Sequence, residues 1–293
     1  MTMEDKGMSR RRMLRVAAVG LLSAGLVSRT TQAVAAGTIE SHYAVRGPWA
    51  VTASDAGDAS GTYRLHHPAD LGAGGFRHPI VTWGNGSHAT PALYPGVLDQ
   101  LASWGFAVIA STDTTTGTGT EMLAAAQYLV ARNADPASPF HQRLDATRVG
   151  AAGHSQGAGG TVNAANLSAG LVTTAVPIAL PAQLWVGAGD RFQVSQLACP
   201  VLFLSGSNDW LISPASALRG YYDQVPGAAA MALLKGAGHN DIQGTGGGFL
   251  GYLTAWLMYR LQDDAYARGA FAGSAPEFTA NTAWQNQAAK NLP

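Results

Sequence analysis

The stretch RVGAAGHSQGAGG, residues 148–160, decides the fold of this 293-residue chain. Residues 148–152 are a short apolar run of the kind that forms a buried strand. Residues 153–157 fit the pattern G-x-S-x-G, a tight turn that carries a serine, here Ser155, from the end of a strand into a helix. The small residues of 158–166 favour a helix that packs closely on a sheet. Strand, turn and helix follow in the order that this motif requires.

Apolar runs alternate with helical stretches on both sides of this motif. Residues 49–54 and 61–65 suggest an antiparallel entry to a sheet. Buried strands are expected at 79–83, 106–110, 148–152, 175–179, 201–204 and 231–234, and helices at 94–103 and 121–132. Pro177 predicts that its strand is interrupted or lies near an edge. Such runs joined by helices are typical of an α/β fold with a mostly parallel central sheet and helices on both faces.

The N-terminal residues have the pattern of an export signal. Three arginines at 10–12 precede the apolar run 16–27, and the small residues Ala33-Val34-Ala35 follow. The apolar run is too short to span a bilayer. We therefore predict a twin-arginine signal peptide over residues 1–36 that is removed, leaving one α/β domain over 37–293 in the periplasm or outside the cell.

Composition limits the kinds of partner. Hydrophobic residues make up 47% of the chain and charged residues 12%, against about 25% charged in an average soluble protein, so a large core is expected. Without residues 1–36, 18 − 6 = 12 basic and 18 − 2 = 16 acidic side chains remain, a net charge of about −4. This charge argues against a nucleic-acid partner. We expect a monomer with no cofactor, no metal and no stable membrane span.

A serine hydroxyl needs a base, and an acid to orient that base. Asp209 follows the apolar run 201–204, at the carboxyl end of a predicted strand, where sites of parallel sheets collect. His239 lies 30 residues further on, in GAGHN after the run 231–234. The order Ser155, Asp209, His239 is that of the α/β-hydrolases. Asp190 and Asp223 remain alternatives for the acid.

The oxyanion of acyl transfer needs two backbone donors. One is expected to be the N–H of Gln156, directly after the nucleophile. The other is expected from the loop 84–87, with Asn85 as the favoured donor, although Asn-Gly could also mark only a tight turn. His154, inside the turn, is expected to pack or hydrogen-bond beneath it.

With these residues, the chain resembles the bacterial cutinase and polyester-hydrolase branch of the α/β-hydrolases. It resembles chlorophyllase-type esterases to a similar degree. The resemblance rests on WGNGS (83–87), LASWGFAVI (101–109), the turn 153–160, and the segments 204–209, 236–239 and 255–257. It implies a secreted serine esterase that forms an acyl-enzyme, with a lidless cleft for polymeric or lipid-like esters and with Trp185 as an aromatic wall.

Three departures from that family concern the cleft and the C-terminus. Gln156 stands where polyester hydrolases often have Met, and Asn85 replaces an aromatic residue of the oxyanion loop. The single Cys199 excludes the terminal disulfide of many relatives. The first two departures imply a more polar cleft.

Two other readings stay open. The same triad could serve an acyltransferase, a dienelactone-hydrolase-like enzyme or an amidase. A non-catalytic binding protein on the same scaffold is the third possibility, because a fold does not fix a function.

Overall fold

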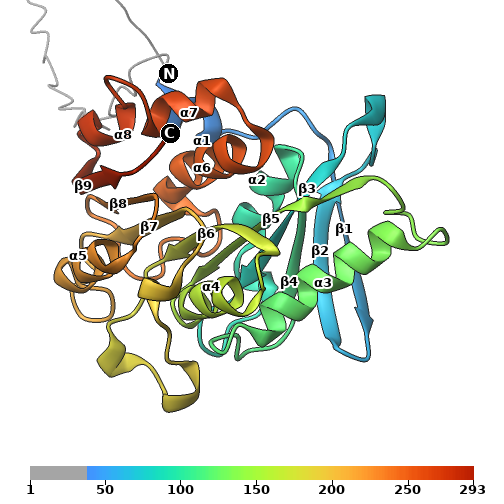
Figure 1. Ribbon diagram of the computed structural model, residues 1–293, viewed down its shortest axis with the longest axis horizontal. Helices are drawn as coiled ribbons and strands as arrows, with labels where there is room; N and C mark the ends of the chain where they lie inside the picture. Colours follow the sequence, from blue (N-terminus) through green and yellow to red (C-terminus); the bar gives the residue numbers. More distant parts are fainter. Residues whose placement is uncertain (1–37) are drawn as a thin grey trace, which may run out of the picture. The chain divides into compact units, whose positions relative to one another are not determined.

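The computed structural model describes residues 38–293, and the predicted signal peptide lies outside them. These residues form one nine-stranded sheet with helices on both faces (Figure 1). The strands are β1 (Val51–Asp58), β2 (Gly61–Pro68), β3 (His78–Gly84), β4 (Ala107–Ser111), β5 (Leu144–His154), β6 (Val172–Ile178), β7 (Val201–Gly206), β8 (Ala229–Leu234) and β9 (Trp284–Lys290).

The order of the strands in the sheet is β1-β2-β4-β3-β5-β6-β7-β8-β9. The strands from β4 to β8 run parallel, whereas the β1/β2, β2/β4 and β8/β9 pairs are antiparallel. The connecting helices are α2 (Pro95–Ser103), α3 (Thr120–Ala134), α4 (Gln156–Leu167), α5 (Ala215–Gln224) and α6 (Leu250–Gln262). The predicted α/β fold with a mostly parallel sheet is confirmed.

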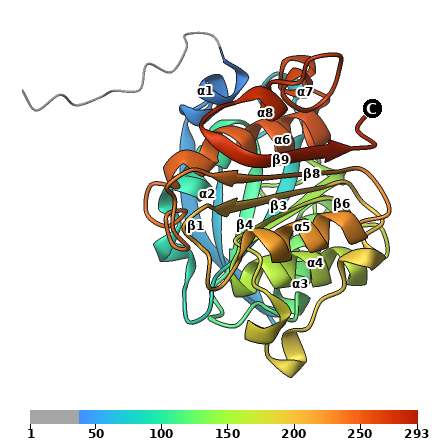
Figure 2. The same ribbon diagram turned by 90° about the vertical axis from the view of Figure 1, so that its left-hand side faces the viewer.

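Two helical layers enclose the sheet, as the view in Figure 2 shows. Helices α3, α4 and α5 pack on one face. On the other face lie α2 and α6, together with the short helices α1 (Ile39–Ala44), α7 (Ala265–Phe271) and α8 (Glu277–Ala280). Both faces of the central strands are therefore buried, which explains why these strands are continuous apolar runs in the sequence.

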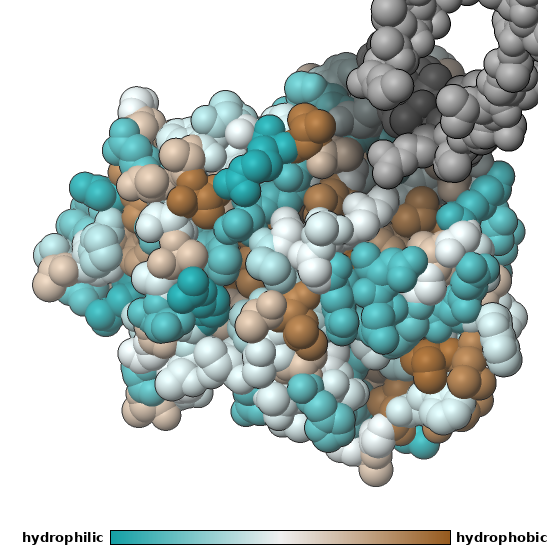
Figure 3. All heavy atoms as spheres, turned by 180° about the vertical axis from the view of Figure 1, so that it is seen from behind, coloured by the Kyte–Doolittle hydropathy of each residue, from teal (hydrophilic) through white to brown (hydrophobic). Residues whose placement is uncertain are grey.

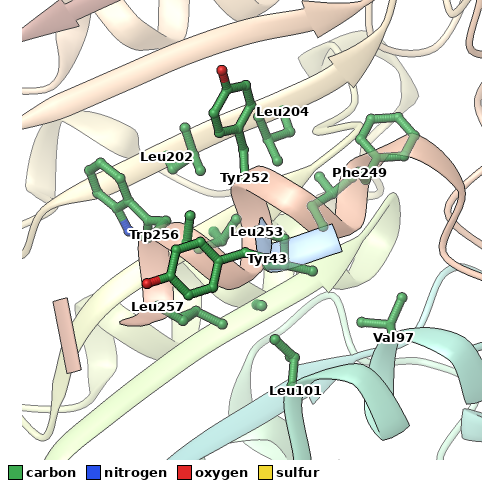
Figure 4. Close-up of a cluster of buried hydrophobic side chains, with 14 of the residues drawn as sticks. Tyr43, Val97, Leu101, Leu202, Leu204, Phe249, Tyr252, Leu253, Trp256 and Leu257 are labelled. Atoms are coloured by element: carbon green, nitrogen blue, oxygen red, sulfur yellow. The ribbon is translucent and has the colours of Figure 1, made fainter. Parts of the chain in front are cut away.

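Helix α6 lies at the centre of the larger core. Its sequence LGYLTAWLMYRLQ is apolar around most of the helix, and ten of its thirteen residues are buried, as expected of a helix enclosed by other elements. Figure 4 shows its Tyr252, Leu253 and Trp256 between β7 and the helices α1 and α2. The Trp256 indole N–H donates to Thr174 Oγ1 of β6 at 2.9 Å, so its one polar group is satisfied.

The first and last described elements are joined by carboxylates. Glu277 of α8 accepts hydrogen bonds from the backbone N–H groups of Ile39 and Glu40, at 2.5 and 2.9 Å. The Glu40 carboxylate in turn accepts from the Trp284 indole N–H at 2.6 Å. Negative charge at a helix N-terminus is stabilising, so Glu277 adds to the local cap in which the Thr38 side chain accepts from the Ser41 N–H.

Two details of the sheet differ from the sequence expectations. Pro177 lies in β6, in the interior of the sheet, so an edge position is wrong. Strand β6 itself is continuous, but its pairing with β7 is interrupted: β6 pairs with β7 only at Ala175 and Ile178, because proline has no N–H for the ladder. Strand β9 was not expected, because WQNQAAK has no apolar run; it forms the edge beside β8.

The parallel strands end at one edge of the sheet. Strands β3, β5, β7 and β8 lead there into loops that carry Gly86, Ser155, Asp209 and His239. The carboxyl edge of a parallel sheet is where binding sites form.

Candidate active site

Ser155 occupies a strained turn between β5 and α4. Its backbone angles are φ 56° and ψ −119°, a region that residues other than glycine rarely adopt. The Ser155 N–H donates to the Ile178 carbonyl at 3.0 Å. A Cβ at Gly157 would collide with the backbone of Gly84 in β3, so only glycine allows α4 to start this close to the sheet. The turn has the geometry expected of a nucleophile elbow.

Ser155, His239 and Asp209 form a continuous hydrogen-bonded chain. Ser155 Oγ lies 2.9 Å from His239 Nε2, and His239 Nδ1 lies 2.6 Å from Asp209 Oδ2. Because a carboxylate only accepts, Nδ1 carries the proton and Nε2 accepts from the serine hydroxyl. Of the alternative acids, Asp190 binds the Gln156 amide and Asp223 binds Arg219. The structure brings Asp209 to His239 and neither alternative.

Hydrogen bonds join the loop that carries Asp209 to the loop that carries His239. The Asn208 N–H donates to the Ala237 carbonyl at 2.9 Å, and the Gly236 N–H donates to Ser207 Oγ at 2.8 Å. Asp209 itself is only 4% exposed, and its Oδ1 accepts from the Ser213 N–H at 3.2 Å. Both carboxylate oxygens are therefore engaged, which fixes the direction from which Asp209 contacts the imidazole.

His154 links the base to the loop after β3. The Gly86 N–H donates to the Tyr94 hydroxyl at 2.9 Å, and that hydroxyl lies 3.0 Å from His154 Nδ1. His154 Nε2 lies 2.8 Å from the carbonyl of His239. A carbonyl only accepts, so Nε2 carries the proton and Nδ1 accepts from Tyr94. Burial lowers the pKa of His154 from 6.5 to about 4, so the ring is neutral near pH 7, as this chain requires.

Replacing Tyr94 by Phe should both slow catalysis and lower the stability of the protein. The change leaves the Gly86 N–H and His154 Nδ1 without partners, at about 1–3 kcal/mol for each buried group. Loss of the link should lower kcat about tenfold, because a displacement of about 1 Å at a reacting group is costly. Ester hydrolysis and thermal unfolding measure the two effects.

Tyr63→Phe is the matched control for this variant. The Tyr63 hydroxyl is buried and has no hydrogen-bond partner among residues 38–293, so its removal should leave kcat unchanged and stability unchanged or higher. Equal kcat values for Tyr94→Phe and Tyr63→Phe would contradict a positioning role for Tyr94.

Stability should fall as the pH is lowered from 6.5 to 4. In this window the unfolded chain binds a proton at His154 that the folded protein does not, so the loss from this residue amounts to about 3 kcal/mol. Burial also lowers the pKa of His66, His67 and His78, which adds to the slope. Guanidinium unfolding between pH 7 and 4 should give a slope for His154→Gln that is smaller by about one proton, and an unchanged slope would contradict the assignment.

A pocket opens beside Ser155 and His239, with a cavity volume of about 400 Å³. Its other lining residues include Ser87, Gln156, Trp185, Asp190 and Phe192. This volume lies in the usual range for small-ligand sites. Trp185 is 48% exposed, and its indole N–H donates to the Leu211 carbonyl at 2.8 Å, which fixes the ring in the wall of the pocket.

The loop after β3 reaches the pocket at Ser87 rather than at Asn85. The Asn85 amide is fully buried and donates to the carbonyls of Ser111 and Asp113, at 2.7 and 3.1 Å. The Asn85 side chain therefore anchors the loop from beneath, and within the predicted loop 84–87 the pocket is lined by Ser87 and not by the favoured Asn85. Ser87 belongs to the loop that the sequence indicated, but it was not the residue favoured there.

Two backbone N–H groups are free at the pocket. Among residues 38–293, no hydrogen bond uses the N–H of Gln156 or of Ser87. Gln156 is the first residue of α4, whose N-terminal N–H groups and dipole attract negative charge. Sequence reasoning named Gln156 for this place, and the structure puts it beside Ser155.

The surface around the site is mixed. Leu184, Trp210 and Leu211, sequence neighbours of Trp185 and Asp209, are 77%, 73% and 53% exposed. On the face shown in Figure 3, apolar residues occur in small groups separated by polar ones. Within the described part of the chain, no cluster of three metal-binding side chains occurs. The helices described over 38–293 include none with the length and apolar character of a membrane span.

Known proteins with similar sequences include two hydrolases. A family model described as PET hydrolase-like matches residues 28–290. A bis(hydroxyethyl) terephthalate hydrolase of Streptomyces coelicolor is 27% identical over 232 residues, covering 75% of this chain and 70% of that protein. A cutinase of Thermobifida alba is 27% identical over 213 residues, covering 66% of this chain and 67% of that protein. The family match extends over every element from α1 to β9.

Proposed function

Because this chain belongs to the PET hydrolase-like family, we propose that it is a serine esterase that hydrolyses carboxylic esters through an acyl-enzyme. The observation that carries the proposal is the hydrogen-bonded chain from Ser155 through His239 to Asp209. Its members come from three separate loops, so their alignment beside a pocket is not a local accident of sequence.

The proposed reaction follows from the protonation states in this chain. Ser155 Oγ attacks the ester carbonyl while His239 Nε2 takes its proton, and Asp209 stabilises the imidazolium that forms. The tetrahedral intermediate collapses, and Nε2 returns the proton to the departing alcohol. A water then attacks the acyl-enzyme with His239 again as base, the acid is released and Ser155 regains its proton.

The negative oxygen of the intermediate is proposed to bind the N–H groups of Gln156 and Ser87. Both groups are free and both residues line the pocket with Ser155. Donors that are fixed before the reaction are worth most, because they need no reorganisation in the transition state. The link from Gly86 through Tyr94 to His154 supports this role, since it fixes the residue next to Ser87.

Two relatives suggest the class of ester. One is named for bis(hydroxyethyl) terephthalate and the other is a cutinase, and the exposed Trp185 offers an apolar wall for a bulky acyl or alcohol group. We propose bulky carboxylic esters, polymeric or lipid-like ones included, as substrates. We also propose that residues 37–293 act as one monomeric domain after export by the twin-arginine route.

Hydrolysis of p-nitrophenyl esters from C2 to C16 and of bis(hydroxyethyl) terephthalate would test the proposal, together with labelling by a fluorophosphonate. We expect turnover, and mass spectrometry should find one label, at Ser155. Faster acyl release on addition of an alcohol would favour an acyltransferase. Absence of both turnover and label would overturn the proposal and favour a binding protein.

A further inference from the structure

Gln156 and Asp190 form a polar pair in the wall of the pocket. The Gln156 side chain donates from Nε2 to Asp190 Oδ2 at 2.7 Å. Because a carboxylate can only accept, this contact fixes the orientation of the amide. The Gln156 Oε1 atom is left buried and without a hydrogen-bond partner in the described part of the chain. A buried polar atom without a partner costs free energy. A ligand that donates a hydrogen bond to Gln156 Oε1 would therefore be favoured.

Asp190 is held in place by its surroundings. It ends a short 3-10 turn (Ala188–Asp190), and its backbone carbonyl accepts from Asn163 Nδ2 of α4 at 3.3 Å. A side chain at Gly117 would collide with the Asp190 carboxyl group, so the loop 112–119 leaves room for it. Among residues 38–293, no Lys or Arg forms an ion pair with Asp190. The pocket therefore contains a fixed carboxylate with no ion-pair partner among the lysines and arginines of residues 38–293.

The other residues of the pocket wall are mainly apolar beside the Gln156–Asp190 pair. Trp185, Val186 and Phe192 line the same pocket and offer no charge. Within the wall, the Gln156 and Asp190 side chains present acceptor oxygens, and Gln156 Nε2 uses one of its two N–H groups to bind Asp190 Oδ2. Such a pair suits a group that can donate hydrogen bonds, and it opposes a negative group.

Building on the proposed esterase function, we propose that Gln156 and Asp190 form a specificity subsite that binds an ammonium or hydroxyl group of the substrate. An ester that carries such a group, separated from its carbonyl by a chain that reaches the pair, is preferred over a neutral ester of the same shape. An ester that carries a carboxylate there is rejected. A diester of a dicarboxylic acid would then be cleaved faster than the half-ester that the first cleavage leaves.

Esters of one length that differ only in their end group test the subsite. On the acyl side these are p-nitrophenyl 6-aminohexanoate, 6-hydroxyhexanoate, heptanoate and hydrogen adipate. On the alcohol side they are 6-aminohexyl, 6-hydroxyhexyl and heptyl butyrate. Their hydrolysis is measured by the release of protons. On the side that the pair contacts, we expect kcat/KM for the ammonium ester to exceed that for the alkyl ester about tenfold or more, as for hydrogen bonds to charged groups. The adipate should be about tenfold worse than the heptanoate.

The variant Asp190→Asn tests the proposed subsite without changing Ser155, His239 or Asp209. The asparagine still accepts from Gln156 Nε2 but carries no charge, so the ratio of ammonium to alkyl kcat/KM should fall to about one. A ratio measured on a single preparation does not depend on the folded fraction. Asp223→Asn removes the same charge from an exposed position on α5 and should leave the ratio unchanged.

The two proposals fail in different ways. Alkyl esters that are hydrolysed as fast as their ammonium counterparts in both series, or a ratio that survives Asp190→Asn, would overturn the subsite and leave the esterase intact. No turnover of any ester, with no label at Ser155, would overturn the esterase function itself.

Discussion

Ser155→Ala should lose at least about a thousandfold in kcat, and up to about a millionfold. The hydroxyl is the atom that attacks the ester, and no other described hydroxyl lies at His239 Nε2. The backbone donors of Gln156 and Ser87 remain in the variant, so a small rate above that of water should persist. The rates are measured with p-nitrophenyl butyrate, and labelling by a fluorophosphonate should disappear.

Ser216→Ala is the control for this variant, because it makes the same exchange on the exposed side of helix α5. Both variants should unfold at the temperature of the unchanged protein, since neither hydroxyl supports the fold. If Ser155→Ala kept more than about a tenth of the activity while Ser216→Ala kept all of it, the acyl-enzyme mechanism would be wrong.

Gly157→Ala should destabilise the protein by about 3 kcal/mol or more, the upper part of the range for overpacking. Its Cβ would meet the backbone of Gly84, and the Asn85 carbonyl oxygen would lie only 2.5 Å away. Backbone atoms of a central strand cannot move aside as a flexible side chain can. Helix α4 must then shift away from β3, which also moves the Gln156 N–H and lowers activity in the protein that remains folded.

Gly220→Ala is the matched substitution, and its expected effect on stability has the opposite sign. Gly220 lies inside helix α5, and a Cβ there would meet nothing within 4 Å. Alanine should therefore stabilise the protein by about 0.5–1 kcal/mol through helix propensity. Guanidinium unfolding measures both variants, and a loss of stability at both positions, or at neither, would contradict the account of α4 packing.

The elements that the sequence predicts best are those whose chemistry is local. The run before Ser155 and the glycines around it specify strand, turn and helix within a dozen residues, and the structure has them there. The placement of Asp209 and His239 followed from a simple rule, because residues after parallel strands meet at one edge of the sheet. Their catalytic roles remain a proposal.

Contacts across the sheet could not be predicted in the same way. Asn85 was favoured as the oxyanion donor, but which residue of a four-residue loop faces the pocket depends on two carbonyls, one at the end of β4 (Ser111) and one just after it (Asp113). Likewise, Pro177 suggested either an interruption or an edge position, and the choice between them depends on β7, which pairs with β6 on either side of the proline. Asp190 was considered only as an acid for His239, since nothing local links it to Gln156.

The hydrogen bonds between Glu277 and helix α1 can form only late in synthesis of the chain. The carboxylate that caps α1 stands 238 residues later in the chain. At about 5–20 residues per second, a ribosome needs roughly 12–48 s to synthesise that interval. Throughout it, the N–H groups of Ile39 and Glu40 must find other partners. These hydrogen bonds can therefore form only after Glu277 has been synthesised, and a chain truncated before that residue lacks them.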